Sequence, residues 1–402
     1  MTSLTDAGAP PDKPAAAELP ILGTYKRAPM QFVRGEGVEL VDVAGKRYLD
    51  LGSGIAVNAL GYGDAGVRKA IVAALDTGLI HVSNLYRTEP AETLAASLVA
   101  QSFADKVFFC NSGAEANEGA FKFARRWGRS VSSGAKTGIV ALRGSFHGRL
   151  FASLAATDRP SYRAPFRPLA GGISICERDP RALDVALDGD SVAAVIVEPV
   201  QGEGGVRVLE ESLLEELRRL TSERGIALVF DEIQCGLGRL GTLFAYESFG
   251  IVPDMVTIAK PLAGGLPMGA ILVTAEIGSV IKPGDHGTTF GGGPLVARAA
   301  IEVLRRVSDP ALLKDIRDNG AWFGEMLRGI AKRTGKVRAI RGMGYMWGID
   351  VVEKASDVIE RGWDAGVLIL SAGDHTLRLL PPLVMSRDDL SRGAALLEQV
   401  LG

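Results

Sequence analysis

Short apolar runs, often β-branched, alternate with helix-like segments between about residues 105 and 275. Seven of these runs have the length of a strand, and several end at a polar or charged residue. They are Lys106 to Cys110, Gly138 to Leu142, Ile173 to Cys176, Ala193 to Glu198, Ile226 to Asp231, Met255 to Ala259 and Ala270 to Val273. Strands that alternate with helices are typical of a mostly parallel sheet covered by helices. The pattern predicts an α/β core in the middle of the chain.

The pattern changes after Gly293-Pro294. A long helical stretch follows, and then the segments Val337 to Val352 and Val367 to Leu380, which have the character of strands around glycines. A last helix is predicted from Arg387. This part of the chain is therefore predicted to be a smaller α+β domain.

Two strand-like pieces, Val38 to Asp42 and Arg47 to Asp50, precede the core. They are too short to fold alone, so we expect them to pack against the small domain. The first twenty residues are rich in Ala and Pro and lack the basic start and apolar centre of a secretory signal, which favours a disordered tail. The predicted organisation is a tail (1–20), an N-terminal segment packing with the small domain (21–64), a large domain (65–295) and a small C-terminal domain (296–402).

Composition supports a large buried core, because 47% of the 402 residues are hydrophobic and only 23% are charged. The formal net charge of −2 and the even spread of Lys and Arg argue against binding to nucleic acid or to a membrane surface. The longest apolar runs, such as Val192 to Val197, are far shorter than a membrane span. We therefore expect a soluble globular protein.

Cysteines and histidines give no sign of a disulfide framework or a metal site. The three cysteines (Cys110, Cys176 and Cys235) are odd in number, widely spaced and set in apolar segments. Such cysteines are typical of reduced thiols in a cytosolic enzyme, so we expect a cytoplasmic protein. The four histidines (His81, His147, His286 and His375) never fall within one helical turn of each other, and no metal is expected.

In open α/β sheets, ligands bind outside the carboxyl ends of the strands, so polar residues that end the apolar runs are the first candidates for a site. One such place is Asn111-Ser112-Gly113, where a strand, a tight turn and a helix follow each other. This order would leave the backbone N–H groups of Gly113 and Ala114 free at a helix N-terminus, where an anion such as phosphate fits. An ordinary helix capped by Ser112 explains the motif equally well.

Glu198, Asp231 and Lys260 also end apolar runs. A carboxylate such as Asp231 at the mouth of a buried strand needs a partner, and a protonated pyridine nitrogen is one possibility. A strand-end Asp that caps the next element is the common alternative. Lys260 follows Met255 to Ala259, and a partly desolvated lysine there would have a lowered pKa and could form a Schiff base.

A competing motif lies in Gly236-Leu-Gly238-Arg-Leu-Gly241, which matches the GxGxxG fingerprint of dinucleotide-binding proteins. It follows Asp231 and Glu232, which would place carboxylates beside a pyrophosphate. No second strand with an acidic end follows at the usual distance of about twenty residues. The motif is therefore a weak indication of a nicotinamide-dependent dehydrogenase.

Several separate motifs occur in an order that resembles the class III aminotransferases of pyridoxal-phosphate fold type I, and most of all the acetylornithine aminotransferase group. The resemblance runs from about Tyr25 to the C-terminus. The motifs that carry it are Asn111-Ser-Gly-Ala-Glu-Ala-Asn-Glu118, Phe146-His-Gly-Arg149, Glu198-Pro-Val-Gln-Gly-Glu-Gly204, Asp231-Glu-Ile-Gln234 and Ala259-Lys260.

The resemblance implies pyridoxal 5'-phosphate as cofactor and a role for seven residues around it. These are Gly113 and Ala114 at the phosphate, Phe146 and Ile233 on the two faces of the pyridine ring, Gln234 at the ring hydroxyl, Asp231 at the ring nitrogen, and Lys260 as the Schiff-base lysine and proton shuttle.

At the substrate, the resemblance implies that Arg149 binds an α-carboxylate and that Tyr25 lines the same pocket. Arg378 matches an arginine that binds glutamate and 2-oxoglutarate, and Glu203 matches the residue that neutralises it when the other substrate is bound. Without the surrounding motifs, both arginines would be taken for surface or ion-pair residues.

The loop His286 to Gly292 resembles a family loop that crosses to the neighbouring subunit. There Thr289 would reach the cofactor phosphate of the other subunit, and Thr288 would lie near the substrate. A homodimer with shared active sites is therefore implied.

The implied reaction transfers the terminal amino group of N2-acetyl-L-ornithine to 2-oxoglutarate and gives N-acetyl-L-glutamate 5-semialdehyde and L-glutamate, a step of arginine biosynthesis. Lysine-pathway aminoadipate-semialdehyde, ornithine and succinylornithine aminotransferases are alternatives, and 4-aminobutyrate is a weaker candidate donor. A glutamate-1-semialdehyde aminomutase is an alternative enzyme class with the same fold and the same lysine. A non-enzymatic alternative is a cofactor-binding regulatory module, but this would need an added DNA-binding segment. The chain departs from the usual pattern at Gly61-Tyr-Gly-Asp64, Leu150 and Gly293, which loosens the assignment of the substrate.

Overall fold

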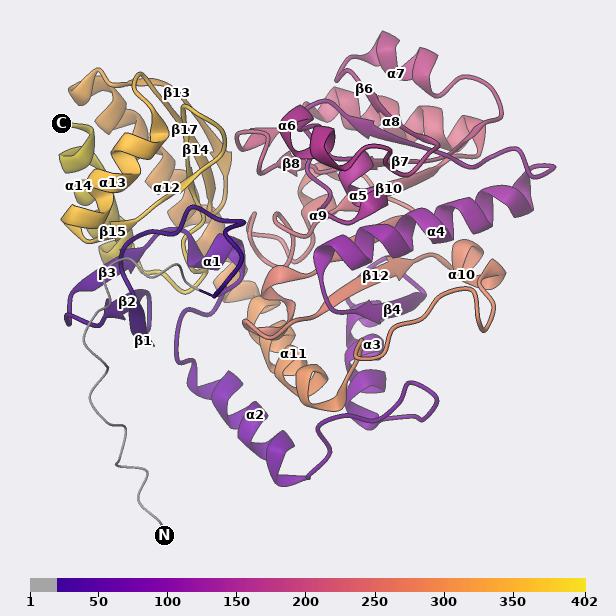
Figure 1. The fold of residues 1–402 in the computed structure, drawn as a ribbon, viewed down its shortest axis with the longest axis horizontal. Coiled ribbons are helices and arrows are strands. Elements are labelled where there is room, and N and C mark those ends of the chain that lie inside the picture. Colours follow the sequence, from indigo (N-terminus) through magenta and orange to yellow (C-terminus); the bar gives the residue numbers. More distant parts are fainter. Residues whose placement is uncertain (1–19) are drawn as a thin grey trace.

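The computed structural model describes residues 20–402 and places two groups of elements side by side (Figure 1). The large group contains the central sheet and its helices, and the smaller group contains the N-terminal strands and the C-terminal elements. The predicted disordered tail lies outside the described residues except for Pro20. Within the described part of the chain, every helix is too short or too polar to span a lipid bilayer.

The central sheet has seven strands in the order β4-β12-β11-β10-β7-β5-β6. Their bounds are β4 Lys106–Cys110, β5 Gly138–Leu142, β6 Ile173–Cys176, β7 Val192–Val197, β10 Ala227–Asp231, β11 Met255–Ile258 and β12 Gly269–Val273. All seven predicted strands are present, and the predicted ends differ by at most one residue. β12 runs antiparallel to both of its neighbours, and the other pairs are parallel. The predicted α/β class with a mostly parallel sheet is confirmed.

Helices cover both faces of this sheet (Figure 1), which explains why strands such as β7 and β10 are continuous apolar runs with every residue buried. α4 packs on β7, β11 and β12, and α8 packs on β10. The helices of this part are α2 Ala65–Asp76, α3 Glu89–Ala100, α4 Gly113–Val131, α5 Phe151–Ala155, α6 Pro160–Arg163, α7 Pro180–Ala186, α8 Glu211–Arg224, α9 Ala245–Phe249, α10 Ala275–Val280 and α11 Pro294–Val307. Two 3-10 turns are η1 Ala164–Phe166 and η2 Lys260–Ala263. A short hairpin is formed by β8 Val200–Gln201 and β9 Arg207–Val208.

The C-terminal part contains a four-stranded sheet in the order β13-β14-β17-β16. Its strands are β13 Val337–Met343, β14 Met346–Val351, β16 Leu370–Ser371 and β17 Thr376–Leu379, and its helices are α12 Pro310–Thr334, α13 Ala355–Ala365 and α14 Arg387–Leu401. The closing helix begins at Arg387, as the sequence predicts. The two longer segments predicted as strands each divide into shorter strands at glycines or turns.

The N-terminal strands form a second four-stranded sheet in the order β1-β2-β3-β15, with β1 Phe32–Glu36, β2 Glu39–Asp42, β3 Arg47–Asp50 and β15 Val367–Leu368. β1 is largely exposed and lacks a buried apolar face, so the apolar pattern does not reveal it. Leu49 on β3 pairs in parallel with Val367 on β15, which joins the beginning of the chain to its end. α11 packs against α2 and α3. The division of the chain into four parts stays a prediction.

The short turn α1 (Ser53–Ala56) follows β3, and its backbone has left-handed φ angles. Its φ angles are 43° at Ser53, 63° at Gly54, 65° at Ile55 and 62° at Ala56. L-residues avoid this region unless the surroundings hold them there. The hydroxyl of Ser53 donates to the carbonyl of Leu380 (2.6 Å), and the backbone N–H groups of Gly52 and Ser53 donate to Asp50. These bonds hold the turn in place.

Candidate active site

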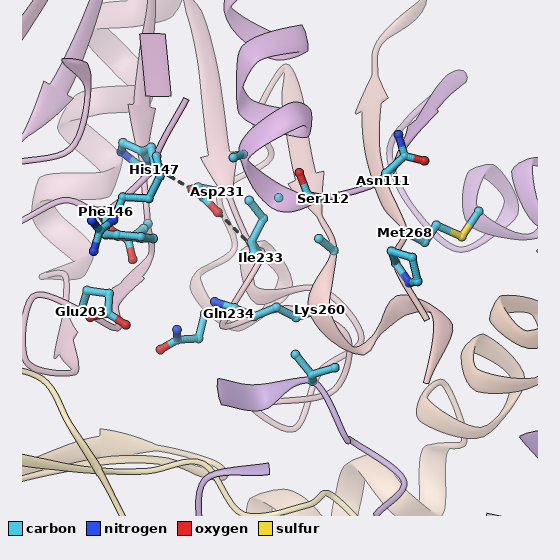
Figure 2. Close-up of a pocket in the computed structure, with 18 of the residues that line it drawn as sticks. Asn111, Ser112, Phe146, His147, Glu203, Asp231, Ile233, Gln234, Lys260 and Met268 are labelled. Carbon is cyan, nitrogen blue, oxygen red and sulfur yellow. Dashed lines mark hydrogen bonds and ion pairs between the residues drawn. The ribbon is translucent and has the colours of Figure 1, made fainter. Parts of the chain in front are cut away.

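A cavity of about 430 Å³ opens at the carboxyl ends of the central strands (Figure 2). Its walls come from the turn after β4, the turn after β5, the ends of β7 and β10, and the turn after β11. The lining includes Asn111, Ser112, Gly113, Ala114, Phe146, His147, Arg149, Glu198, Glu203, Asp231, Ile233, Gln234 and Lys260. Most of the predicted site residues therefore lie together at one edge of the sheet, where polar residues end the apolar strands.

The N-terminus of α4 forms one end of the cavity. The hydroxyl of Ser112 caps the helix by accepting from the backbone N–H of Glu115 (3.2 Å). Gly113 and Ala114 lie in the first turn, where backbone N–H groups have no partner inside the helix. A Cβ at Gly113 would come within 2.8 Å of the Ile233 side chain, so only glycine allows this approach. The turn fits a phosphate group, which such a helix end attracts.

Asp231 lies at the floor of the cavity and is only 3% exposed. One carboxylate oxygen accepts from Nδ1 of His147 (2.8 Å) and from the side-chain amide of Asn117 (2.7 Å), and the other accepts from the backbone N–H of Ile233 (3.1 Å). Asn117 is itself held by the hydroxyl of Thr257 on β11 (2.8 Å). This network fixes the direction of the carboxylate.

His147 and Asn117 belong to the motifs Phe146–Arg149 and Asn111–Glu118, but the sequence alone predicts no role for either. A histidine directly after Phe146 in a motif at a strand end was the available signal. Asn117 falls on the second turn of α4, where an asparagine has no pattern to distinguish it. Both act through contacts with Asp231, more than 80 residues away in the sequence.

Glu198 follows β7 and is also buried. Its carboxyl group accepts from the backbone N–H groups of Phe146 (2.8 Å) and Gly202 (3.2 Å). Burial, with a smaller contribution from the nearby Asp231, raises the pKa of Glu198 to about 7, while His147 acts in the opposite direction. Glu198 thus connects the turn that carries Phe146 to the turn that leads to Glu203.

Lys260 opens the turn η2 with a φ of 35°, which lies in the left-handed region. A lysine there is held by its surroundings, and such conformations are common at functional sites. Burial lowers the pKa of Lys260, and Arg378 lowers it further, while Asp231 and Glu203 act in the opposite direction. A lowered pKa makes the neutral amine, which is the nucleophilic form, easier to reach.

Arg149 enters the cavity beside Phe146. Its guanidinium lies 3.5 Å from the centre of the Tyr162 ring and 5.8 Å from the centre of the Phe146 ring. Stacking on aromatic faces is a common way to hold an arginine while its N–H groups stay free. Tyr162, on α6, is not predicted from the sequence, because nothing in its local sequence distinguishes it from other surface tyrosines.

Glu203 and Arg378 form an ion pair with 2.6 Å between Oε1 and Nη1. Arg378 is only 3% exposed, and the same nitrogen donates to Oε1 of Gln234 (3.2 Å). Nε of Arg378 is buried, and no described residue accepts a hydrogen bond from it. Glu203 comes from the hairpin β8–β9 and Arg378 from β17, so the pair joins the two groups of elements.

Four residues predicted at the site do not line this cavity: Tyr25, Thr288, Thr289 and Arg378, the last of which contacts the lining residues Glu203 and Gln234. Tyr25 is 76% exposed. The hydroxyl of Thr288 accepts from Asn111 (3.0 Å), and Thr288 lines a neighbouring cleft with His286. Thr289 is exposed beside it. The predicted roles of these residues stay predictions, and for Thr289 the predicted contact is with another subunit.

The glycine loop that resembles a dinucleotide fingerprint is filled by its own packing. Arg239, in its middle, is buried and donates to the carbonyls of Tyr345 (3.1 Å) and Pro381. Burial lowers the pKa of Arg239 to about 9. A Cβ at Gly236 would meet the Glu232 carbonyl at 2.8 Å, so this glycine serves a close approach of the chain to itself. The loop ties the C-terminal part to the central sheet.

Comparison with known proteins gives consistent matches over nearly the whole chain. A family model described as "Aminotransferase class-III" matches residues 23–401. The mitochondrial acetylornithine aminotransferase of Alnus glutinosa is 44% identical over 391 residues, covering 96% of this chain and 86% of that protein. The acetylornithine aminotransferase of Methanocaldococcus jannaschii is 40% identical over 382 residues, covering 94% and 95%. The succinylornithine transaminase of Yersinia enterocolitica is 42% identical over 385 residues, covering 93% of each.

Solved structures give the same picture. The ornithine aminotransferase from Toxoplasma gondii superposes with a TM-score of 0.90 at 27% identity, covering 95% of this chain and 92% of that chain. The N-acetylornithine aminotransferase from Stenotrophomonas maltophilia superposes with a TM-score of 0.82 at 34% identity, covering 94% and 96%.

Proposed function

The chain belongs to the class III aminotransferases, and from this premise we propose that it transfers the terminal amino group of N2-acetyl-L-ornithine to 2-oxoglutarate. The products would be N-acetyl-L-glutamate 5-semialdehyde and L-glutamate, which places the enzyme in arginine biosynthesis. The observation that carries the proposal is the ion pair between Arg378 and Glu203, because Glu203 lines the same cavity as Arg149. Relatives named acetylornithine aminotransferase support the choice of donor.

The family uses pyridoxal 5'-phosphate, and the cavity fits this cofactor. When bound, the cofactor supplies an electron sink that lets an amino group and a proton be exchanged at a carbon atom. Asp231, held by His147 and Asn117, would keep the ring nitrogen protonated. The first turn of α4 would hold the phosphate through Gly113 and Ala114.

Four further residues would hold and use the cofactor. Phe146 and Ile233 would cover the two faces of its ring, and Gln234 would donate a hydrogen bond to its ring hydroxyl. Nζ of Lys260 would hold the cofactor and carry the proton that leaves the donor carbon. The lowered pKa of Lys260 supports this role, because a neutral amine must be present to accept the proton.

The two substrates differ at the reacting carbon. In glutamate and 2-oxoglutarate that carbon bears a carboxylate, which Arg378 can bind once Glu203 turns away. In acetylornithine the reacting carbon bears no carboxylate, because its single carboxylate lies at the far end of the chain, and Glu203 can stay on Arg378. Arg149, stacked on Tyr162, would bind the α-carboxylate of the acetylornithine donor.

A second candidate donor is succinylornithine, because a succinylornithine transaminase is 42% identical to this chain. This donor keeps a free carboxylate at the end of its acyl group. The ratio of kcat/KM for the two acylated ornithines would decide between them.

We propose further that the enzyme is a homodimer with shared active sites. Large apolar side chains are exposed beside the cleft that holds Thr288, in two neighbouring segments; they are Leu79, Ile80, Leu85, Tyr86 and Phe290. The two segments touch, since Asn84 donates to the Thr288 carbonyl (2.9 Å) and the rings of His81 and Phe290 are 5.4 Å apart. Exposed apolar groups of this size favour a partner. Light scattering at micromolar concentration tests the dimer.

The cytoplasmic location stays a prediction from the reduced cysteines, and one relative, from Alnus glutinosa, is named mitochondrial.

A single-turnover absorbance measurement tests the reaction. The holoenzyme is mixed separately with N2-acetylornithine, succinylornithine, ornithine, 4-aminobutyrate and glutamate, and conversion of the cofactor to its amine form is followed. Rapid conversion by acetylornithine and by glutamate, without conversion by 4-aminobutyrate, is expected. Conversion by 4-aminobutyrate in preference to acetylornithine would contradict the proposed donor, and amine exchange without any oxoacid would indicate an aminomutase.

A further inference from the structure

Residues 202–206 form the tip of the hairpin β8–β9 and carry Glu203 into the cavity. Three arginines from different places bind three successive carbonyl groups of this tip. They are Arg159 at the Glu203 carbonyl, Arg207 at the Gly204 carbonyl (3.1 Å) and Arg341 at the Gly205 carbonyl (2.6 Å). The tip also contains two residues with positive φ, Gly205 (103°) and Val206 (52°). The backbone beneath Glu203 is therefore tightly constrained.

One of these arginines belongs to a row across the small sheet. Arg341 on β13 pairs with Gly348 on β14, and Gly348 pairs with Arg378 on β17. Directly paired residues of antiparallel strands have their side chains on the same face. A Cβ at Gly348 would lie 2.9 Å from both the Gly205 carbonyl and Cβ of Val206, so the tip rests on the sheet at this glycine. Arg341 thus contacts the backbone of the tip, Gly348 contacts its surface, and Arg378 contacts the Glu203 side chain.

Arg341 is fixed on its other side. It makes a two-pronged ion pair with Asp350 (2.6 and 2.8 Å), and the hydroxyl of Thr376 donates to the same carboxylate (2.6 Å). A guanidinium held in this way has a defined direction, since the planar fork matches the carboxylate. Its remaining Nε–H points to the Gly205 carbonyl.

We propose that Arg341 is a positioning residue that holds Glu203 on Arg378 and thereby sets the preference between one-carboxylate and two-carboxylate substrates. The inference rests on the proposed function, because it assumes that Arg378 receives the carboxylate on the reacting carbon of 2-oxoglutarate. Arg341 itself touches no substrate. It fixes the tip so that Glu203 closes on Arg378 without first ordering the loop, which favours the closed pair.

A positioning role and a purely electrostatic role of Arg341 predict opposite changes in the affinity for a dicarboxylate. If the tip is loosened, the closed pair becomes weaker and Arg378 is more available, so a dicarboxylate binds more tightly. If Arg341 acted only as a nearby positive charge, its removal would make a dicarboxylate bind more weakly. The two possibilities are therefore distinguishable by the direction of one change.

The test uses binding of unreactive acids to the holoenzyme, measured by calorimetry. Glutarate has two carboxylates, and pentanoate is its one-carboxylate counterpart. For Arg341→Met we expect glutarate to bind about three- to fivefold more tightly and pentanoate to bind as in the wild type. Arg338→Met is the matched control, because Arg338 lies on the same strand, is exposed and donates to the Val352 carbonyl (3.2 Å); it should change neither constant.

Two further variants protect the test against misfolding. Arg341→Lys keeps the charge but cannot bind both Asp350 and the Gly205 carbonyl in the same way, and Gly348→Ala pushes the tip off the sheet. Both should shift glutarate binding in the same direction as Arg341→Met. Unchanged or weaker glutarate binding in the folded variants, judged by an unaltered thermal transition, would overturn the inference, as would tightening by Arg338→Met.

The proposed function is judged separately, by single-turnover conversion with acetylornithine in the wild-type enzyme. If that conversion fails while glutarate binding still shifts, the donor is wrong and the role of Arg341 stands. If acetylornithine is converted but glutarate binding does not shift, the proposed donor stands and the role of Arg341 is wrong.

Discussion

On the proposed cofactor side of the cavity, Asp231 is held by His147, Asn117 and the backbone of Ile233, whereas on the proposed substrate side Arg378 is held mainly by Glu203, across two groups of elements. The first arrangement is a closed network between strand ends and α4. The second is one ion pair between charged groups that a substrate carboxylate can replace. A rigid floor suits a reaction step common to every substrate, and an exchangeable ion pair suits a site that receives two substrates in turn.

The largest expected effect is that of Lys260→Ala, because no other described residue that lines the cavity carries an amine to replace Nζ. Turnover should fall by at least about 10⁴-fold with every amine donor. The rate of product formation at saturating substrate measures this. Lys260→Arg keeps a positive charge and should be almost as inactive; substantial activity in either variant would contradict the role of Lys260.

Asp231→Asn should lower kcat by about 10² to 10⁴-fold, since a neutral amide no longer favours a protonated ring nitrogen. The loss should be the same for acetylornithine and glutamate, because the cofactor side serves both. His147→Phe, which removes one donor to Asp231, should give a smaller loss of the same kind. A loss confined to one of the two amines would place Asp231 on the substrate side instead.

Tyr162→Leu should raise KM for acetylornithine by about tenfold with little change in kcat, because Arg149 loses the ring on which it stacks. Tyr162→Phe keeps the ring and is the matched control, with KM close to that of the wild type. Initial rates over a range of donor concentrations give both constants. If the Phe variant were as impaired as the Leu variant, the hydroxyl and not the ring would be responsible.

A smaller effect is expected in the dependence of stability on pH. Because burial raises the pKa of Glu198 to about 7 from 4.5, the folded protein keeps this proton in a range where the unfolded chain releases it. The stability contributed by this group is fully present below about pH 4.5 and is lost as the pH rises through about 7. Its size is at most about 3 kcal/mol.

Glu198→Gln should therefore flatten the fall of the thermal transition temperature between pH 5 and pH 7.5, measured by differential scanning fluorimetry at closely spaced pH values. Glu215→Gln, at an exposed position on α8, is the control and should leave the slope unchanged. An unaltered slope in the Glu198 variant would mean that the carboxyl is already ionised throughout this range.

The difference between the Asp231 network and the Glu203–Arg378 pair also explains which site residues the sequence could predict. Asp231 and Lys260 end apolar strands of a parallel sheet, so the hydrophobic pattern alone places them at one edge. Arg149 and Arg378 could be assigned only through the resemblance, since an arginine near a strand end has no distinctive pattern. Tyr162 and Arg341 act through contacts between elements far apart in the sequence, and no local signal marks them. The left-handed turn at Ser53–Ala56 likewise depends on distant hydrogen bonds, such as the bond from Ser53 to Leu380.

The most direct test of the contrast compares Asp231→Asn and Glu203→Gln in single-turnover reactions with N2-acetylornithine and with glutamate. We expect Asp231→Asn to slow both reactions by the same factor. Glu203→Gln should change the ratio of the two apparent affinities by about tenfold in favour of glutamate, with maximal rates close to those of the wild type. A changed ratio in Asp231→Asn, or an equal slowing of both reactions in Glu203→Gln, would contradict the division of the cavity into a cofactor side and a substrate side.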